Sequence, residues 1–242
     1  MSSPDGESAN PRPSLVVLGA TGAVGSQAVA AAIVSRGFAV VTTLGRRALT
    51  LPMPSPTDAH ADPRVVQHIV DVADPKTYES HLAGHDVAIC TLGLGQPSKT
   101  SKEEFQRVDR DCVLAFAQAC RRQGTRHFTL LTAVGANPAS SVFYLRVKGE
   151  IEALVRELRF ERTTFFRPSM LLTDENRYGW SQGLMLAMFP RIEGLLAGPL
   201  RKYRGIRVDQ LGRAMITNAL RATTSPGVVE IHEWDAIKAL LA

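Results

Sequence analysis

The sequence predicts an α/β protein, a doubly wound parallel sheet with a small C-terminal lobe. Short apolar segments alternate with helical segments along most of the chain, which is typical of a parallel sheet covered by helices on both faces. The first apolar segment, residues 14–20, is nearly free of polar residues, as in a strand buried on both sides. It runs directly into a glycine-rich turn that precedes the first expected helix.

The expected elements follow in order along the chain. Strands are expected at residues 14–20, 38–45, 65–72, 86–93, 127–135 and 162–171, where Val, Ile, Leu, Thr and Phe are concentrated. Helices are expected at residues 26–37, with Gly37 as the C-cap, at 101–124, with Ser101 as the N-cap, and around Tyr144 and Lys148. The proline-rich residues 48–63 are expected to form a surface loop, because proline breaks regular helix.

The two ends of the chain differ from this alternating centre. Residues 1–13 are rich in Pro, Ser and Gly and are expected to be a disordered tail. Residues 14–242 are expected to form one domain, within which residues 174–205, apolar but interrupted by Gly and Pro, form a lid or substrate lobe. We expect a short strand, an Asp209 cap and a helix in residues 206–222, and a final strand and helix in residues 228–242.

The composition narrows the class of protein. The 242 residues, 45% of them hydrophobic, suffice for one large domain with a full core. The formal charge of +5 comes from scattered basic residues, so we expect an anionic small molecule as ligand and no nucleic-acid partner. The three cysteines lack paired spacing, which predicts buried free thiols and neither a disulfide framework nor a metal site.

The sequence shows no signal-peptide pattern and no apolar run of membrane-spanning length. These features predict a soluble cytoplasmic protein without a membrane partner. The apolar stretch at residues 183–189 is interpreted as part of the lid and core rather than as a membrane anchor. The oligomeric state stays open.

The turn after the first strand reads GATGAVG, with a G-x-x-G-x-x-G spacing. At the junction of a first strand and a first helix, such a loop lets backbone N–H groups and the helix dipole hold a pyrophosphate, as in Rossmann dinucleotide sites. A glycine loop that serves tight geometry and binds nothing is the alternative. The cofactor contacts expected from this loop are Gly19, Thr21, Gly22, Ala23, Val24 and Gly25.

Two arginines follow the second strand, where NAD sites usually carry an acidic residue. No Asp or Glu occurs between the glycine loop and Asp58, and Arg46 and Arg47 stand there instead. Guanidinium groups suit the 2′-phosphate of NADP, so the sequence predicts NADP(H) as cofactor; two solvated surface arginines are the alternative. Further contacts are expected after the third and fourth strands, from Asp71 and Val72 at the adenine and from Thr91, Leu92 and Gly93 beside the cofactor.

These stretches resemble the short-chain dehydrogenase/reductase superfamily, in its atypical, extended-like branch. The resemblance is closer still to the Tat-interacting protein family of oxidoreductase-like proteins. It is carried, in order, by GATGAVG, LGRRALT, GHDVAICTLG, VDRDCVLAFA, HFTLLTAVGAN, FYLRVKGEIEA and FRPSMLL, and the resemblance extends over roughly residues 14–241, nearly the whole chain. Most of these stretches are loose matches singly, and their order makes the match specific for the fold.

The resemblance implies catalytic roles for Tyr144 and Lys148, the Y-x-x-x-K pair of the superfamily. The spacing alone places both on one helix face, which also fits two ordinary residues of an amphipathic helix. In relatives the Tyr donates a proton to a carbonyl, while the Lys favours the phenolate and holds the nicotinamide ribose. The usual Ser at the end of the fifth strand is Thr132 here, with Ser140 and Ser141 as nearby alternatives.

The resemblance further places Pro168 along the nicotinamide amide, with Leu171 and Arg177 closing over the cofactor. Asp109 either orients the site or is an exposed helical acid. His85 and His127, beside strand starts, are interpreted as structural residues.

Two functions are consistent with this pattern. The first is an NADPH-dependent oxidoreductase that reduces a small carbonyl substrate, with Tyr144 as proton donor. The alternative is an NADPH-binding regulatory or protein-interaction protein with little or no turnover, which the Tat-interacting relatives suggest. The substrate stays unidentified, because fold does not fix function.

Overall fold

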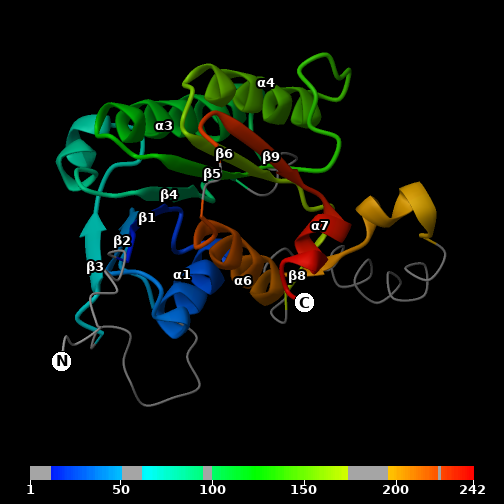
Figure 1. Cartoon of the computed structure of the whole chain (residues 1–242). Helices are drawn as coiled ribbons and strands as arrows, with labels where there is room; N and C mark the ends of the chain where they lie inside the picture. Colours follow the sequence, from blue (N-terminus) through cyan, green and yellow to red (C-terminus); the bar gives the residue numbers. More distant parts are fainter. Residues whose placement is uncertain (1–11, 51–61, 95–99, 174–195, 223–224) are drawn as a thin grey trace, which may run out of the picture.

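The structure, a computed structural model, describes residues 12–50, 62–94, 100–173, 196–222 and 225–242. Its centre is a seven-stranded parallel sheet in the order β3-β2-β1-β4-β5-β6-β9 (Figure 1). The strands are β1 (Ser14–Leu18), β2 (Val40–Gly45), β3 (Val65–Ile69), β4 (Val87–Cys90), β5 (His127–Leu131), β6 (Arg162–Phe166) and β9 (Val228–His232). This order is the doubly wound Rossmann order extended by one strand, so the expected fold class is confirmed.

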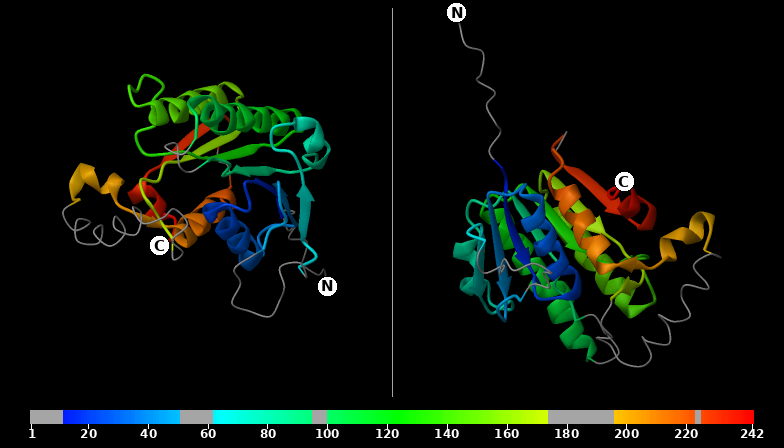
Figure 2. Two further views of the ribbon diagram at one scale, coloured as in Figure 1. Left: turned by 180° about the vertical axis from the view of Figure 1, so that it is seen from behind. Right: turned by 90° about the horizontal axis from the view of Figure 1, so that it is seen from below.

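Helices cover both faces of the sheet (Figures 1 and 2). One face carries α1 (Ala23–Ser35), α6 (Val208–Ala219) and α7 (Trp234–Ala239), and the other carries α2 (Lys102–Gln106), α3 (Val113–Arg122) and α4 (Phe143–Glu157). Short 3-10 turns lie at Pro75–Thr77, Glu79–His81 and Gly198–Tyr203, and β7 (Leu171–Leu172) pairs in parallel with β8 (Ile206–Arg207). Crossovers of this kind bury the five inner strands on both sides, which explains their apolar sequences, while the edge strands β3 and β9 stay partly exposed.

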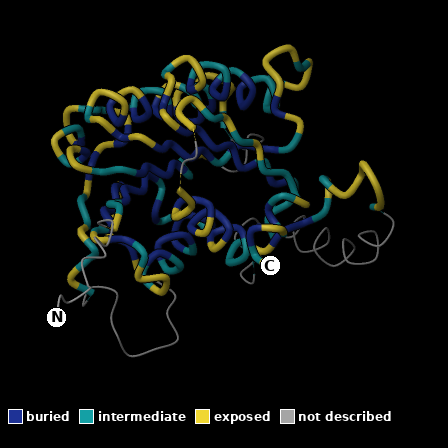
Figure 3. The backbone as a smooth tube through the Cα atoms, viewed as in Figure 1, coloured by how far each residue is buried: buried dark blue, intermediate teal, exposed yellow. Residues whose placement is uncertain are grey.

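Two apolar cores, one on each face, hold these layers together, and the buried positions run through the sheet and the inner sides of the helices (Figure 3). On the α3–α4 face, Phe128 stacks on Phe160 with ring centroids 5.0 Å apart and meets Phe116 at 5.9 Å. The thiols of Cys90, Cys112 and Cys120 are buried and unpaired, as expected. None of the helices in the described ranges has the length and apolar character that a membrane span requires.

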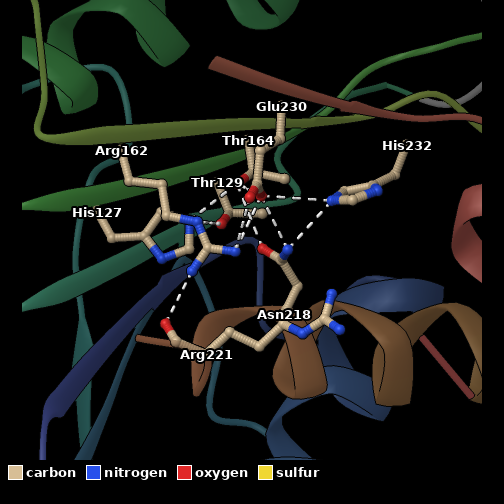
Figure 4. Close-up of polar contacts among 8 residues, drawn as sticks. All are labelled: His127, Thr129, Arg162, Thr164, Asn218, Arg221, Glu230 and His232. Atoms are coloured by element: carbon tan, nitrogen blue, oxygen red, sulfur yellow. Dashed lines mark hydrogen bonds and ion pairs between the residues drawn. The ribbon is translucent and has the colours of Figure 1, made fainter. Parts of the chain in front are cut away.

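A polar cluster joins the last strand to α6 (Figure 4). Glu230 of β9 receives hydrogen bonds from Arg162, Thr164 and Asn218 at 2.9–3.0 Å. Burial opposes the charge of Glu230, but these donors outweigh it and lower its pKa to about 2. Burial lowers the pKa of His127 to about 3, so its ring is neutral and bonds to Thr164 at 2.9 Å. These hydrogen bonds connect the edge strand β9 to β6 and α6, so the cluster has a structural role.

Two expected helix ends are wrong. Arg36, not Gly37, takes the left-handed conformation after α1, with φ +52°. Gly37 serves packing instead, because a Cβ there would approach the Leu220 side chain to 2.6 Å. Arg207 is the N-cap of α6, so Asp209 lies in the first turn, where it accepts a hydrogen bond from Arg207 Nε.

The strands β3, β4, β5 and β6 end three to five residues earlier than expected, because the residues after them turn into the loops at the carboxyl edge of the sheet. The long helix is present, and Ser101 caps it by accepting the Glu104 N–H at 3.1 Å. It is interrupted, however, by a π-helical segment at Arg107–Cys112.

Part of the expected organisation lies outside the described residues. This applies to residues 1–11 of the tail, 51–61 of the proline-rich loop, and 174–195 of the lobe, including Arg177. The described end of the lobe packs on α7, where the Arg201 and Arg204 guanidinium groups lie over the Trp234 ring at 5.1–5.2 Å.

Candidate functional site

The glycine loop follows β1 and needs glycine at two of its positions. Gly19 has φ +87°, and a Cβ on it would lie 2.7 Å from Leu92 N and 2.8 Å from the Thr91 carbonyl carbon. A Cβ on Gly25 would lie 2.2 Å from Gly19 O. The loop therefore packs directly against the end of β4 and against the first turn of α1.

The N-terminus of α1 is open to an anion. Gly22 is the N-cap, no side chain caps the helix, and its first turn holds no acidic residue. Unpaired N–H groups and the positive end of the helix dipole therefore face the loop, where Thr21, Ala23 and Val24 also lie. These features fit the pyrophosphate of a dinucleotide.

The residues that follow β2 and β3 lie at the same edge of the sheet as the glycine loop. Arg46 and Arg47 are exposed directly after β2. After β3, Val72 is buried, while Asp71 is exposed and accepts the Ala73 N–H at 2.9 Å. All of these residues lie at the carboxyl edge of the sheet, beside the switch point between β1 and β4, where open α/β sheets bind ligands.

A cavity of about 100 Å³ lies at the same edge, beyond β4, β5 and β6. It is lined by Thr91, Leu92, Gly93, Asp109, Leu131, Thr132, Tyr144, Lys148, Pro168, Ser169 and Leu171. The structure thus brings together all three catalytic candidates and the predicted nicotinamide contacts, apart from Arg177. Ser140 and Ser141 do not line the cavity, and Ser140 Oγ accepts the Val142 N–H instead.

Lys148 is held by a buried acid. Its Nζ lies 2.8 Å from Asp109 Oδ1, and the two side chains are 8% and 2% exposed. Burial by itself lowers the pKa of Lys148, but the charge of Asp109, with a smaller contribution from Tyr144, more than offsets this, so the pKa lies above its ordinary value. Asp109 Oδ2 also accepts the Leu94 N–H at 2.9 Å, which ties the lysine to the loop after β4.

Asp109 is therefore an orienting residue and not an exposed helical acid. It lies in the π-helical segment at Arg107–Cys112. A π turn holds an extra residue, which shifts the side chains that follow around the helix axis, and such segments are frequent at functional sites. The regular helix that the sequence predicts contains no such shift.

Thr132 is engaged by a second buried ion pair. Its Oγ1 donates to Glu152 Oε1 at 2.6 Å. Glu152 is also bound through both oxygens by Arg167, with Nε 2.9 Å from Oε1, and this contact raises the pKa of Arg167. By contrast, the Tyr144 hydroxyl makes no hydrogen bond within the described ranges.

The sequence interpretation missed Glu152, Arg167 and Ser169. A signal for Glu152 was present, because Tyr144, Lys148 and Glu152 recur every four residues and so share one face of α4. His85 and His127 lie at the amino end of the sheet and bond to Thr42 and Thr164, in keeping with structural roles.

The strand order, and the edge at which these side chains gather, define a dinucleotide-binding domain of the Rossmann type. The chain belongs to the NAD(P)H-binding family, whose model matches residues 19–184. It is 35% identical to Protein HTATIP2 of Rattus norvegicus over 224 residues, covering 93% of this chain and 87% of that protein. The expected family is thereby confirmed.

More distant relatives agree on the fold. The fmp52 protein of Emericella nidulans is 26% identical over 86% of this chain and 88% of its own length. Among solved structures, MoeE5 in complex with UDP-glucose and NAD superposes with a TM-score of 0.67 at 16% identity, over 90% of this chain and 74% of that one. At that identity the likeness shows the fold alone.

The cytoplasmic location expected from the sequence is wrong by the same comparison. The fungal relatives from Emericella nidulans, Debaryomyces hansenii and Candida albicans are all named mitochondrial proteins. The features used for the expectation, an absent signal-peptide pattern and absent membrane-length runs, bear on secretion and membrane insertion only.

Proposed function

We propose that this protein is an NADPH-dependent oxidoreductase that reduces a small carbonyl substrate. The observation that carries the proposal is the single cavity in which Tyr144 and Lys148 meet the ends of β4, β5 and β6. A glycine loop and an uncapped helix N-terminus stand at the same edge of the sheet. This arrangement supports the proposal, because it puts the proposed cofactor site next to the proposed proton donor.

The residues that line the cavity have different roles in the proposed reaction. When bound, NADPH supplies the hydride that the carbonyl carbon takes up. Tyr144 holds the proton at its phenol oxygen and gives it to the carbonyl oxygen, so that an alcohol forms. Lys148, cationic because of Asp109, favours the resulting phenolate and has N–H donors left for ribose hydroxyls.

Support for NADPH over NADH comes from the exposed Arg46 and Arg47 and from the absence of an acid at that position. Each charge-assisted bond to a 2′-phosphate contributes about 1.5–3 kcal/mol. Arg46→Ala is therefore expected to weaken NADPH binding about tenfold or more and to leave NADH binding nearly unchanged, measured by nucleotide fluorescence. Arg213→Ala, an exposed arginine on α6, is the matched control. Equal losses for both nucleotides would contradict the phosphate argument.

A second candidate function, an NADPH-binding regulatory protein with little turnover, has one observation in its favour. Both Lys148 and Thr132 are already engaged by buried carboxylates, Asp109 and Glu152. A protein that no longer turns over a substrate would keep these bonds, because they stabilise its fold.

A screen of aldehydes, ketones and quinones for NADPH oxidation separates the two functions. Tyr144→Phe is then expected to fold, to bind NADPH normally and to lower turnover about a hundredfold or more, the scale of a lost general acid. Tyr78→Phe, which removes a buried hydroxyl without a described partner from the core beneath α3, is the control. Wild-type turnover by Tyr144→Phe would refute the assigned proton donor.

A further inference from the structure

The side-chain donors that line the cavity are not equally available to a substrate. Thr91 Oγ1 donates to Gly19 O at 3.1 Å, Thr132 Oγ1 donates to Glu152, and Lys148 is paired with Asp109. Among the residues that line the cavity, Tyr144 and Ser169 carry hydroxyls that have no hydrogen-bond partner within the described ranges.

Thr132 is a poor donor to a substrate for a chemical reason. A hydroxyl carries one proton, and that of Thr132 lies on a carboxylate that is 3% exposed. Rotating the Thr132 hydroxyl so that its proton points into the cavity would break its hydrogen bond to the buried Glu152 carboxylate. That rotamer is therefore disfavoured by about tenfold to a hundredfold. Toward the cavity, Thr132 therefore offers lone pairs, which do not polarise a carbonyl oxygen.

Ser169 stands on a backbone that is fixed on both sides. Pro168 O accepts the Val134 N–H at 2.9 Å, and Met170 O accepts the Ile206 N–H at 2.9 Å. Leu171 then enters β7, which pairs with β8. The backbone of the segment between β6 and β7 is thus fixed, and donors carried on a fixed backbone are suited to stabilise charge in a transition state.

We propose that Ser169, and not Thr132, is the second hydrogen-bond donor to the reacting oxygen of the substrate. The assignment rests on the proposed carbonyl reduction. Tyr144 transfers its proton to that oxygen, while Ser169 keeps its own proton and donates a hydrogen bond. Thr132 instead joins the Glu152–Arg167 pair and holds α4 against the ends of β5 and β6.

The test compares Ser169→Ala with Thr132→Val, and uses Ser141→Ala, an exposed serine outside the cavity, as control. Melting temperature without ligand, NADPH affinity, and turnover of phenanthrenequinone or of the best member of the carbonyl panel are measured. Ser169→Ala is expected to keep its melting temperature and NADPH affinity and to lose about tenfold to a hundredfold in kcat. Thr132→Val is expected to melt earlier and to retain more of its kcat than Ser169→Ala.

Three results overturn the assignment of Ser169: wild-type kcat in Ser169→Ala, a loss confined to NADPH affinity, or a melting temperature lowered as far as that of Thr132→Val. These failures occur in an active wild-type protein. A wild-type protein that reduces no carbonyl on the panel refutes the proposed function itself, and the assignment with it.

Discussion

Replacing Asp109 by Asn tests the ion pair on which the candidate site depends. The change nearly keeps the shape of the side chain, removes its charge and replaces one of its two acceptor oxygens by an NH2 group. Lys148 and Asp109 are 8% and 2% exposed and lie 2.8 Å apart, so little water can replace the lost partner. Removing one member of a buried pair typically costs about 3–5 kcal/mol, because the other charge is left uncompensated.

The protonation of Lys148 sets an upper bound to that loss. The folded variant can bury a neutral lysine, and deprotonating a lysine of ordinary pKa at pH 7 costs about 4.6 kcal/mol. We therefore expect Asp109→Asn to lose about 3–4.6 kcal/mol in free energy of unfolding, measured by urea denaturation at pH 7. For a chain of this size, that is roughly 6–18 °C in melting temperature.

The pH dependence separates lost charge from lost packing. In the wild-type protein the folded pKa of Lys148 is raised, so its contribution is fully present below the ordinary lysine pKa and is lost only as pH rises through the folded value. In Asp109→Asn, burial lowers the folded pKa, and the unfolded state binds more protons. The free energy of unfolding of the variant should then rise relative to wild type by up to about 1.4 kcal/mol per unit between pH 7 and 9.5.

The double variant Asp109→Asn with Lys148→Met supplies the control, because it removes both charges. It should recover much of the stability that the single variant loses. A single variant within about 1 kcal/mol of wild type, with the same pH profile, would refute the reasoning that a buried charge depends on Asp109.

Two further predictions concern the glycine loop and the polar cluster. Gly25→Ala places a Cβ 2.2 Å from Gly19 O, so the loop must shift. We expect NADPH affinity to fall at least about tenfold in a fluorescence titration. An unchanged affinity would argue against a pyrophosphate at this loop. The folded pKa of His127 is about 3, so its contribution to stability is complete above its unfolded pKa near 6.5 and is lost as the pH falls from 6.5 toward 3. In His127→Gln this loss is absent, so the free energy of unfolding should fall less steeply between pH 7 and 4 than in the wild type, measured by urea midpoints.

The sequence could predict the fold and the outer part of the site because both follow from local patterns. Apolar segments of strand length, separated by helical segments, are sufficient for a parallel sheet. The carboxyl ends of parallel strands meet at one edge, so Gly19, Arg46, Asp71, Thr91 and Thr132 had to lie on the same side of the molecule. The cavity confirms this for Thr91 and Thr132.

The hydrogen-bond partners of the site could not be predicted in the same way. Asp109 approaches Lys148 through a π-helical segment, which hydropathy patterns do not reveal. Arg167 lies after β6 and Glu152 on α4, and only packing of the helix on the sheet brings them together. A hydroxyl that looks available in the sequence, that of Thr132, is thereby engaged.

Charge is distributed unequally over the candidate site, and this bears on both the affinity for the proposed nucleotide and the proposed proton transfer. At the reacting end, the buried Lys148 is paired with Asp109, and the partly buried Arg167 nearby is paired with Glu152, so each of these cations has a carboxylate partner. At the proposed phosphate end, Arg46 and Arg47 are exposed after β2, and neither forms an ion pair within the described ranges, although the charge of Glu104 is felt at Arg46. Exposed charges attract an anion over about a Debye length and are screened by salt, whereas buried pairs are screened far less. We therefore expect salt to act mainly on the affinity for the proposed nucleotide, and protonation to act mainly on the proposed transfer of a proton from Tyr144.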